Sequence, residues 1–311
     1  MAVNKNGIVV MGAVFVDIKG FPDDVYIPDG RNAGKVEYIH GGVSRNVVED
    51  IANMELRPTF LSIVDESALG DAVVRKLNNH KVNTEYIQSA PNGMGTWLAV
   101  FDNNGDLAGS ISQRPDLMPL LDVLAKKGDE IFANADSIII EVDVDKEIVK
   151  KVVELCEKYQ KKLYGVVSNM SIAVERRDFL QKFDCFICNQ LEAGMFFADD
   201  FSETAPKELA EILAKKLQLA KIPSMVVTMG GAGSVYADMK GKKGFCPAKK
   251  VQVKDTTGAG DAFCAGVSSG LTYGKTLAES VEIGTRLAAS VITSSENVCP
   301  RFLPGELGIE A

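Results

Sequence analysis

One stretch of the sequence places a carboxylate beside a turn suited to binding an anion. It reads Asp-Thr-Thr-Gly-Ala-Gly-Asp from Asp255 to Asp261, and apolar residues at helical spacing follow it. Glycines let a ligand approach the backbone, and the first amides of a helix lack acceptors within the helix. Together with the helix dipole they form an anion site. Asp261 could therefore take a proton from a hydroxyl group while the turn stabilises phosphoryl oxygens. Alternatively, Asp261 stabilises the start of the helix.

The elements before this turn must bring an acceptor to it. A short strand is expected over 248–253, directly before the turn. The apolar run from Gly7 to Val14 predicts a buried parallel strand. Asp17 would then follow the carboxyl end of that strand, where open α/β sheets bind ligands, although it could also serve to end the strand in a turn. Asp143, just past a strand expected over 137–140, could reach the same ligand.

A second glycine turn opens a helix earlier in the chain. Gly41 and Gly42 precede apolar residues at helical spacing, and Asn46 lies in the first turns of that helix. An amide side chain offers both a donor and an acceptor to the hydroxyl groups of a sugar. The alternative is a tight turn followed by a surface asparagine.

The remaining pattern predicts one α/β domain over residues 1–311. From Thr59 onward, strands alternate with helices, which indicates a parallel sheet covered on both faces. Two blocks, at about 18–40 and 94–112, instead predict short strands, among them 25–27 and 35–39, and a hairpin. We expect these blocks to form a small β-sheet that acts as a lid.

Composition and charge limit the classes of partner and the cellular location that we expect. The chain has 311 residues, is 46% hydrophobic and carries a net charge of -8, which disfavours nucleic-acid and anionic membrane surfaces. No signal peptide or membrane-spanning run is evident, so we expect a cytoplasmic protein. Cys185 and Cys188 form a C-x-x-C on an expected strand, without a second pair to complete a zinc site. They are interpreted as buried free thiols on opposite faces of that strand.

The Asp255–Asp261 stretch resembles the D-T-x-G-A-G-D signature of the PfkB family, the ribokinase-like carbohydrate kinases. The resemblance implies a three-layer α/β/α fold with a mostly parallel sheet, and a sugar or nucleoside kinase that uses ATP. It makes Asp261 the catalytic base and Gly258, Ala259 and Gly260 the anion hole. The earlier glycine turn is similar to the family's G-G-x-x-x-N motif. The resemblance therefore assigns acceptor binding to the residues Asp17, Gly41, Gly42 and Asn46.

Further motifs of the family lie at the expected nucleotide end. Asn189 and Glu192 match its N-x-x-E motif, which positions magnesium-bound waters, although the same pair could form a helix capping box. The ATP-binding turn T-x-G-x-x-G, otherwise a glycine-rich hairpin, is matched by the residues Thr228, Gly230 and Gly233. Family members often bind K⁺ near Asp255 and Thr257 and often form homodimers through the lid.

More narrowly, the segments around Asp17, Asn32 and Gly41 resemble pseudouridine kinases, which implies transfer to the 5'-hydroxyl of pseudouridine. Two segments depart from that subgroup, at 112–116 and 165–168, and both are expected near the acceptor. A ribokinase or another sugar or nucleoside kinase remains an alternative. From a different class, so does a non-catalytic sensor that binds a sugar or nucleotide. A dehydrogenase is disfavoured because the first expected turn lacks G-x-G-x-x-G.

Overall fold

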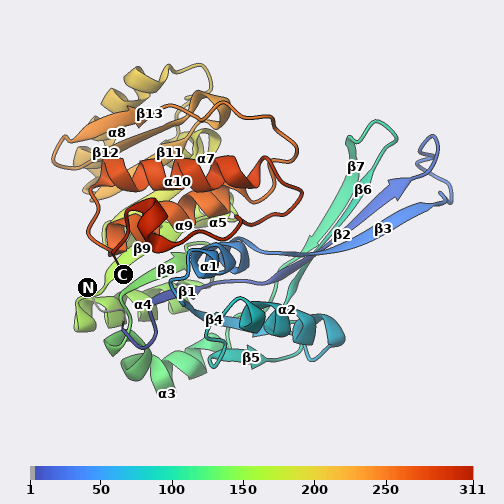
Figure 1. The fold of residues 1–311 in the computed structure, drawn as a ribbon, viewed down its shortest axis with the longest axis horizontal. Coiled ribbons are helices and arrows are strands. Elements are labelled where there is room, and N and C mark those ends of the chain that lie inside the picture. The colour runs from blue at the N-terminus through green and yellow to red at the C-terminus, as the bar shows by residue number, and fades with distance from the viewer. Residues whose placement is uncertain (1–3, 311) are drawn as a thin grey trace.

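The computed structural model describes residues 4–310 and shows a large sheet covered by helices, from which a small second sheet projects (Figure 1). The large sheet has the strand order β13-β12-β11-β10-β9-β8-β1-β4-β5. Its strands run parallel, except that β12 pairs antiparallel with β11 and β13. Its strands are β1 (Ile8–Met11), β4 (Thr59–Val64), β5 (Ile87–Ser89), β8 (Ser137–Glu141), β9 (Lys162–Val166), β10 (Cys185–Asn189), β11 (Ser224–Thr228), β12 (Ser234–Asp238) and β13 (Lys243–Cys246). The predicted α/β class with a mostly parallel sheet is confirmed.

Helices cover both faces of this sheet. One core is shared with α1 (Val43–Asn53), α2 (Ala68–Asn79), α9 (Ala259–Thr272) and α10 (Leu277–Val291). The other is shared with α3 (Leu120–Ala133), α4 (Lys146–Tyr159), α5 (Met170–Ala173), α6 (Arg177–Leu180), α7 (Gln190–Phe197) and α8 (Pro206–Ala220). Strand β1 shows why: Val9 and Met11 enter one core, Ile8 and Val10 the other, and all four are buried. A strand buried on both faces needs the continuous apolar run seen in the sequence.

The small sheet has the strand order β3-β2-β6-β7 and extends away from the body of the molecule (Figure 1). Its strands are β2 (Phe15–Pro22), β3 (Gly34–Gly41), β6 (Gly95–Phe101) and β7 (Leu107–Gln113). The strand expected at 25–27 is wrong, because the exposed connection between β2 and β3 contains no strand. That this sheet moves as a lid, and that 1–311 is one domain, remain predictions.

Two further expectations about local structure are wrong. Asp17 does not follow the end of a long first strand, because the chain leaves β1 at Met11 and Asp17 lies within β2 of the small sheet. Residues 248–253 form no strand, although their apolar residues alternate. They are largely exposed, with Val253 58% accessible, and they pair with no described strand.

The two cysteines of the C-x-x-C motif point to opposite faces of their strand, as predicted. Cys185 and Cys188 are buried free cysteines of β10, and their side chains enter opposite cores. Among the described residues, no helix is long and apolar enough to cross a membrane.

Candidate active site

A cavity of about 790 Å³ lies where the small sheet meets the carboxyl ends of strands of the large sheet. Each of the five residues predicted to bind the acceptor lines it, and so does the predicted base Asp261. The lining residues from this set are Asp17, Gly41, Gly42, Asn46, Asp143 and Asp261. The fold thus brings together residues that lie up to 244 positions apart in the sequence, from 17 to 261.

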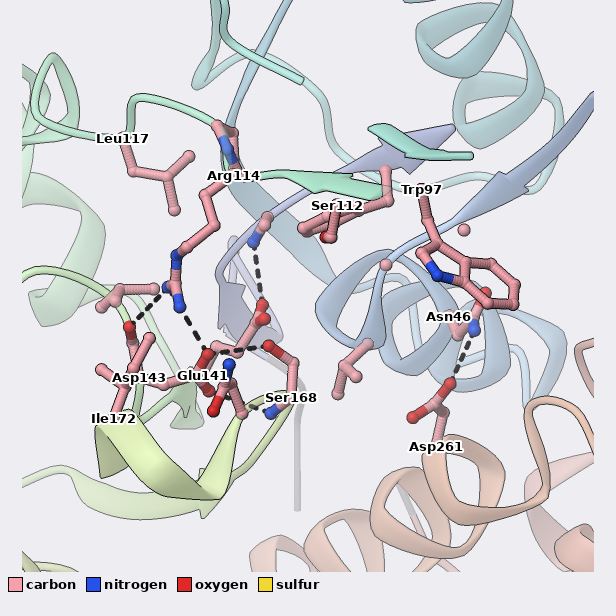
Figure 2. Close-up of a pocket in the computed structure, with 18 of the residues that line it drawn as sticks. Asn46, Trp97, Ser112, Arg114, Leu117, Glu141, Asp143, Ser168, Ile172 and Asp261 are labelled. Atoms are coloured by element: carbon pink, nitrogen blue, oxygen red, sulfur yellow. Dashed lines mark hydrogen bonds and ion pairs between the residues drawn. The ribbon is translucent and has the colours of Figure 1, made fainter. Parts of the chain in front are cut away.

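Asp261 and Asn46 meet on the floor of this cavity (Figure 2). The Nδ2 atom of Asn46, on α1, donates to Oδ2 of Asp261, in the first turn of α9, over 2.6 Å. Burial raises the pKa of Asp261 to about 7, and the hydrogen bond from Asn46 offsets only part of that rise. A carboxylate with such a pKa can accept a proton near neutral pH.

The glycine turn before α9 is closed on one side and open on the other. Gly258 has φ +81°, and a Cβ there would lie 1.9 Å from the carbonyl oxygen of Asn297. A Cβ on Gly260 would meet no atom within 4 Å. The amide of Ala259 donates to Thr256, whereas the amides of Gly260 and Asp261 have no acceptor within the described chain. Two unpaired amides therefore face the open side of the turn.

Close backbone approach also explains the Gly41–Gly42 pair. A Cβ at Gly41 would lie 2.7 Å from the carboxylate of Asp17, and Gly42 has φ +99° at the N-cap of α1. Burial raises the pKa of Asp17, while the charges of Lys19 and Arg45 act in the opposite direction. Arg45 donates to the carbonyl oxygens of His40 and Gly41, so a buried cation holds this turn in place.

The opposite end of the cavity is built around Asp143. Its carboxylate accepts hydrogen bonds from the backbone amide and the hydroxyl of Ser168, at 2.9 and 2.8 Å. Arg114, just after β7, donates to the Asp143 carbonyl oxygen over 2.9 Å and forms an ion pair with its carboxylate at 3.6 Å (Figure 2). Glu141 lies beside them and accepts from Ser44 and from the Ala13 amide. Burial and the neighbouring Asp143 carboxylate raise the pKa of Glu141.

The residues predicted to bind the nucleotide lie together, outside this cavity. Asn189 and Thr228 are paired partners at the ends of β10 and β11. Asn189 caps α7, and it forms with Glu192 the capping box that the sequence left as an alternative. The Thr228 turn is the β11–β12 hairpin, in which Gly230 and Gly233 adopt positive φ. These structural roles do not test the predicted nucleotide and metal contacts.

Two carboxyl groups suggested for metal ions, those of Asp255 and Glu192, have pKa values shifted in opposite directions. The carboxylate of Asp255 accepts from the amide of Thr257 over 2.8 Å, and this bond lowers its pKa. Burial raises the pKa of Glu192, and the negative charge of Asp143 adds to that rise. No group of three or more His, Cys, Asp or Glu side chains suited to a metal occurs within 4–310.

Sequence reasoning missed Arg114, Glu141 and Trp97 as lining residues. Glu141 ends β8 two positions before Asp143, and Trp97 pairs with Asp17 across the small sheet. A signal existed for Arg114, because it lies in the 112–116 segment that departs from pseudouridine kinases. Ser168, in the other departing segment, also lines the cavity.

Comparison with known proteins places this site in a family. The chain matches the model of the pfkB family carbohydrate kinases over residues 5–299. It is 35% identical over 294 residues to a guanosine-inosine kinase of Exiguobacterium acetylicum, covering 94% of this chain and 96% of that protein. It is 25% identical over 279 residues to a pseudouridine kinase of Escherichia coli (strain K12), covering 89% and 87%.

Comparison with solved structures identifies the fold. The structure of Arabidopsis thaliana ribokinase complexed with ribose and ATP superposes with a TM-score of 0.84 at 19% sequence identity, covering 98% of this chain and 99% of that one. This likeness confirms the ribokinase-like fold that the sequence predicted. The chain therefore belongs to the pfkB family of carbohydrate kinases, phosphotransferases that act on a hydroxyl group of a sugar or nucleoside.

Proposed function

We propose that this protein transfers the γ-phosphoryl group of ATP to the 5'-hydroxyl group of a nucleoside, with Asp261 as the general base. The observation that carries the proposal is the position of Asp261. Its carboxylate lies on the floor of the acceptor cavity, bonded to Asn46, at the head of a helix whose first amides are unpaired. A base and an anion site side by side are what phosphoryl transfer to an alcohol requires.

The reaction follows from these contacts. Asp17, Gly42 and Asn46 hold the ribose so that its 5'-hydroxyl group faces Asp261. As the hydroxyl oxygen bonds to the γ-phosphorus, its proton passes to the Asp261 carboxylate and the bond from phosphorus to the departing ADP oxygen breaks. The turn from Gly258 to Gly260 stabilises the phosphoryl oxygens. Closure of the small sheet would exclude water, which would otherwise accept the phosphoryl group.

The nucleotide would lie beyond the glycine turn. Asn189, Thr228, Gly230 and Gly233 would contact ATP from the neighbouring ends of β10 and β11. Mg²⁺, held through water by Asn189 and Glu192, would neutralise phosphate charge when bound. The fit rests on the donor set, since Asn189 and Glu192 supply amide and carboxylate oxygens and the capping box uses only the Oε2 atom of Glu192. Asp255 and Thr257 are the candidates for K⁺, since the Asp255 carboxylate remains largely exposed.

A purine nucleoside is the acceptor we favour. The guanosine-inosine kinase shares 35% of residues with this chain, against 25% for the pseudouridine kinase. The cavity of about 790 Å³ falls within the range of roughly 300–1,000 Å³ typical of small-molecule sites, so a base has room beyond the ribose. Pseudouridine is the second candidate, supported by the segments around Asp17, Asn32 and Gly41. Family membership disfavours the sensor.

A substrate panel tests the proposal. Purified protein with ATP and Mg²⁺ is given guanosine, inosine, adenosine, pseudouridine, uridine, ribose and fructose 6-phosphate in turn. ADP release is measured, and the product is identified by mass spectrometry. A nucleoside 5'-monophosphate supports the proposal. Phosphorylation of ribose alone would point to a ribokinase, and no ADP release with any acceptor would favour the sensor.

We also infer that two copies associate through the small sheet. The face turned away from Asp17 carries a row of apolar side chains in register across its four strands, formed by Tyr38, Ile18, Leu98 and Ile111. Tyr38 and Ile111, at the two ends of this row, are 61% and 71% exposed, an unusual state for large apolar residues on one face. Light scattering should give a dimer mass, and Ile111→Asp should give a monomer. A monomeric wild type would remove this inference.

A further inference from the structure

The far end of the acceptor cavity holds a cation with unused donors. Arg114 lines the cavity with a side chain that is 48% exposed, while the Asp143 side chain that anchors it is 1% exposed. The hydrogen bond and the ion pair from Arg114 to Asp143 both use its Nη2 atom. Among the described residues, its Nε and Nη1 atoms donate to no acceptor. Three of the five N–H donors of a guanidinium are therefore available to a ligand.

This end of the cavity is where the base of a nucleoside must lie. Asp261 and Asn46 mark the reacting end, and the proposed ATP residues do not line the cavity. The part of the acceptor that does not react therefore fills the rest of the cavity, which Arg114 and Asp143 line. Ala13 and Glu141 connect the two ends, since the Ala13 amide bonds Glu141 and Glu141 bonds Ser44 of α1. Figure 2 shows Arg114 and Asp143 facing the cavity across from Asn46 and Asp261.

Arg114 presents hydrogen-bond donors to a base at this position. Asp143 is already bonded by Ser168 and paired with Arg114, so its carboxylate offers little to a ligand. Guanine and hypoxanthine present two neighbouring acceptors, O6 and N7, which an arginine recognises well. Adenine has an amino group in place of O6, and this group would direct its hydrogens at the guanidinium.

We propose that Arg114 selects 6-oxopurine nucleosides, by donating hydrogen bonds to O6 and N7 of the base, with Asp143 as the positioning residue that aims the guanidinium. The inference rests on the proposed nucleoside kinase activity and names the acceptor class within it. Arg114 follows the last strand of the small sheet, whereas Asp143 follows β8 of the large sheet. Selection of the base by Arg114 therefore requires contact between the small sheet and the large sheet.

The test compares guanosine, inosine, adenosine and 7-deazaguanosine in the wild type and in Arg114→Met. In the wild type, kcat/KM should be higher for guanosine and inosine than for adenosine, and 7-deazaguanosine, which lacks the N7 acceptor, should fall below guanosine. Arg114→Met should lower kcat/KM for guanosine and inosine about 10- to 100-fold, because one good arginine–base contact is lost. The loss should appear in KM, since the contact is made equally in the ground and transition states.

Two features of the design separate selection from a structural role. Adenosine turnover should change little in Arg114→Met, and the penalty for 7-deazaguanosine should shrink in that variant. Asp143→Asn should also reduce the guanosine-to-adenosine ratio, which mere support of the fold would not alter. Arg75→Met, on the exposed face of α2, is the matched control and should leave every ratio unchanged. If Arg114→Met does not fold, Arg114→Gln and the wild-type 7-deazaguanosine comparison carry the test.

The outcomes distinguish the two levels of the proposal. If the wild type phosphorylates nucleosides without preferring 6-oxopurines, or if Arg114→Met lowers turnover of all nucleosides equally, the role of Arg114 is overturned while the kinase activity stands. If no nucleoside is phosphorylated but another sugar is, both the proposed function and the selection by Arg114 fall.

Discussion

Two successive residues of α1 each hold a carboxylate, with opposite consequences. Arg45 Nη1 lies 2.6 Å from Oε2 of Glu49, and Asn46 Nδ2 lies 2.6 Å from Oδ2 of Asp261. Burial acts to raise the pKa of both carboxyl groups. For Glu49 the charges of Arg45, Lys76 and His80 outweigh burial, and its pKa is lowered. For Asp261 burial prevails, and the pKa rises to about 7.

The difference lies in the partner rather than in the distance. A cation stabilises the charged form of a buried carboxylate strongly, whereas a neutral amide stabilises it only in part. Glu49 is therefore fixed as an anion and serves to hold Arg45, which in turn holds the Gly41–Gly42 turn. Asp261 keeps the ability to take up a proton. One helix thus supplies both the structural ion pair and the partner of the proposed base.

Removing the proposed base should have the largest effect on activity. Asp261→Asn keeps the shape of the side chain but cannot accept a proton, so kcat should fall about 10²- to 10⁴-fold. Binding of ATP, measured by calorimetry, should persist. Glu49→Gln is the informative comparison, because it should reduce stability more than it reduces the turnover of folded enzyme. A variant Asp261→Asn with near-normal kcat would exclude Asp261 as the base.

Breaking the Arg45–Glu49 ion pair should affect stability more than activity. Arg45→Met leaves Glu49 buried without its main cation, which should lower the free energy of unfolding by about 3 kcal/mol, since Lys76 and His80 remain nearby. Denaturant unfolding at neutral pH measures this. Because a lowered pKa contributes stability above its unfolded value that is lost as pH falls through the folded value, the gap to wild type should narrow in acid. Lys76→Met, at a partly exposed position, should cost less; an equal cost would contradict the assignment to Arg45.

The contact between Asn46 and Asp261 could be predicted from the sequence better than the ion pair between Arg45 and Glu49. Asp261 and Asn46 both lie in motifs with a chemical meaning, so their meeting across 215 positions could be expected. Arg45 and Glu49 are four residues apart on a helix, a spacing equally typical of an exposed pair. Nothing in that spacing reveals that both side chains are almost fully buried.

Long-range geometry explains the other differences. The apolar run before Asp17 does not reveal that the chain passes from the large sheet to the small one between Met11 and Phe15. Alternation over 248–253 satisfied the pattern of a strand, but a strand also needs a partner, and the local sequence does not supply that information. Arg114 reaches Asp143 across 29 positions, a contact between two elements that no motif connects.

The proposed anion hole beside Asp261 must leave space for the phosphoryl oxygens. Substitutions at two glycines of that turn, Gly258 and Gly260, test this. Gly260→Ala places a methyl group where no atom outside its own turn of the helix lies within 4 Å, so stability should be kept. If phosphoryl oxygens occupy that space, kcat should fall about tenfold or more, because they are held away from the amides. Gly258→Ala should lower the melting temperature as well, since its Cβ would collide with the backbone of Asn297. Normal turnover in Gly260→Ala would contradict the anion-hole role.

The smallest expected effect is a shift in pH dependence, and it addresses the amide partner directly. A base with a pKa of about 7 is protonated below that pH, so kcat/KM should rise tenfold per pH unit in acid and level off above about 7. Asn46→Ala removes a hydrogen bond that lowers this pKa, so the acidic limb should move to higher pH. The variant should consequently lose more activity at pH 6 than at pH 8. Asn79→Ala, exposed at the end of α2, should leave the limb in place. If the limb stays fixed in Asn46→Ala, the group that titrates in catalysis is not the carboxylate held by Asn46.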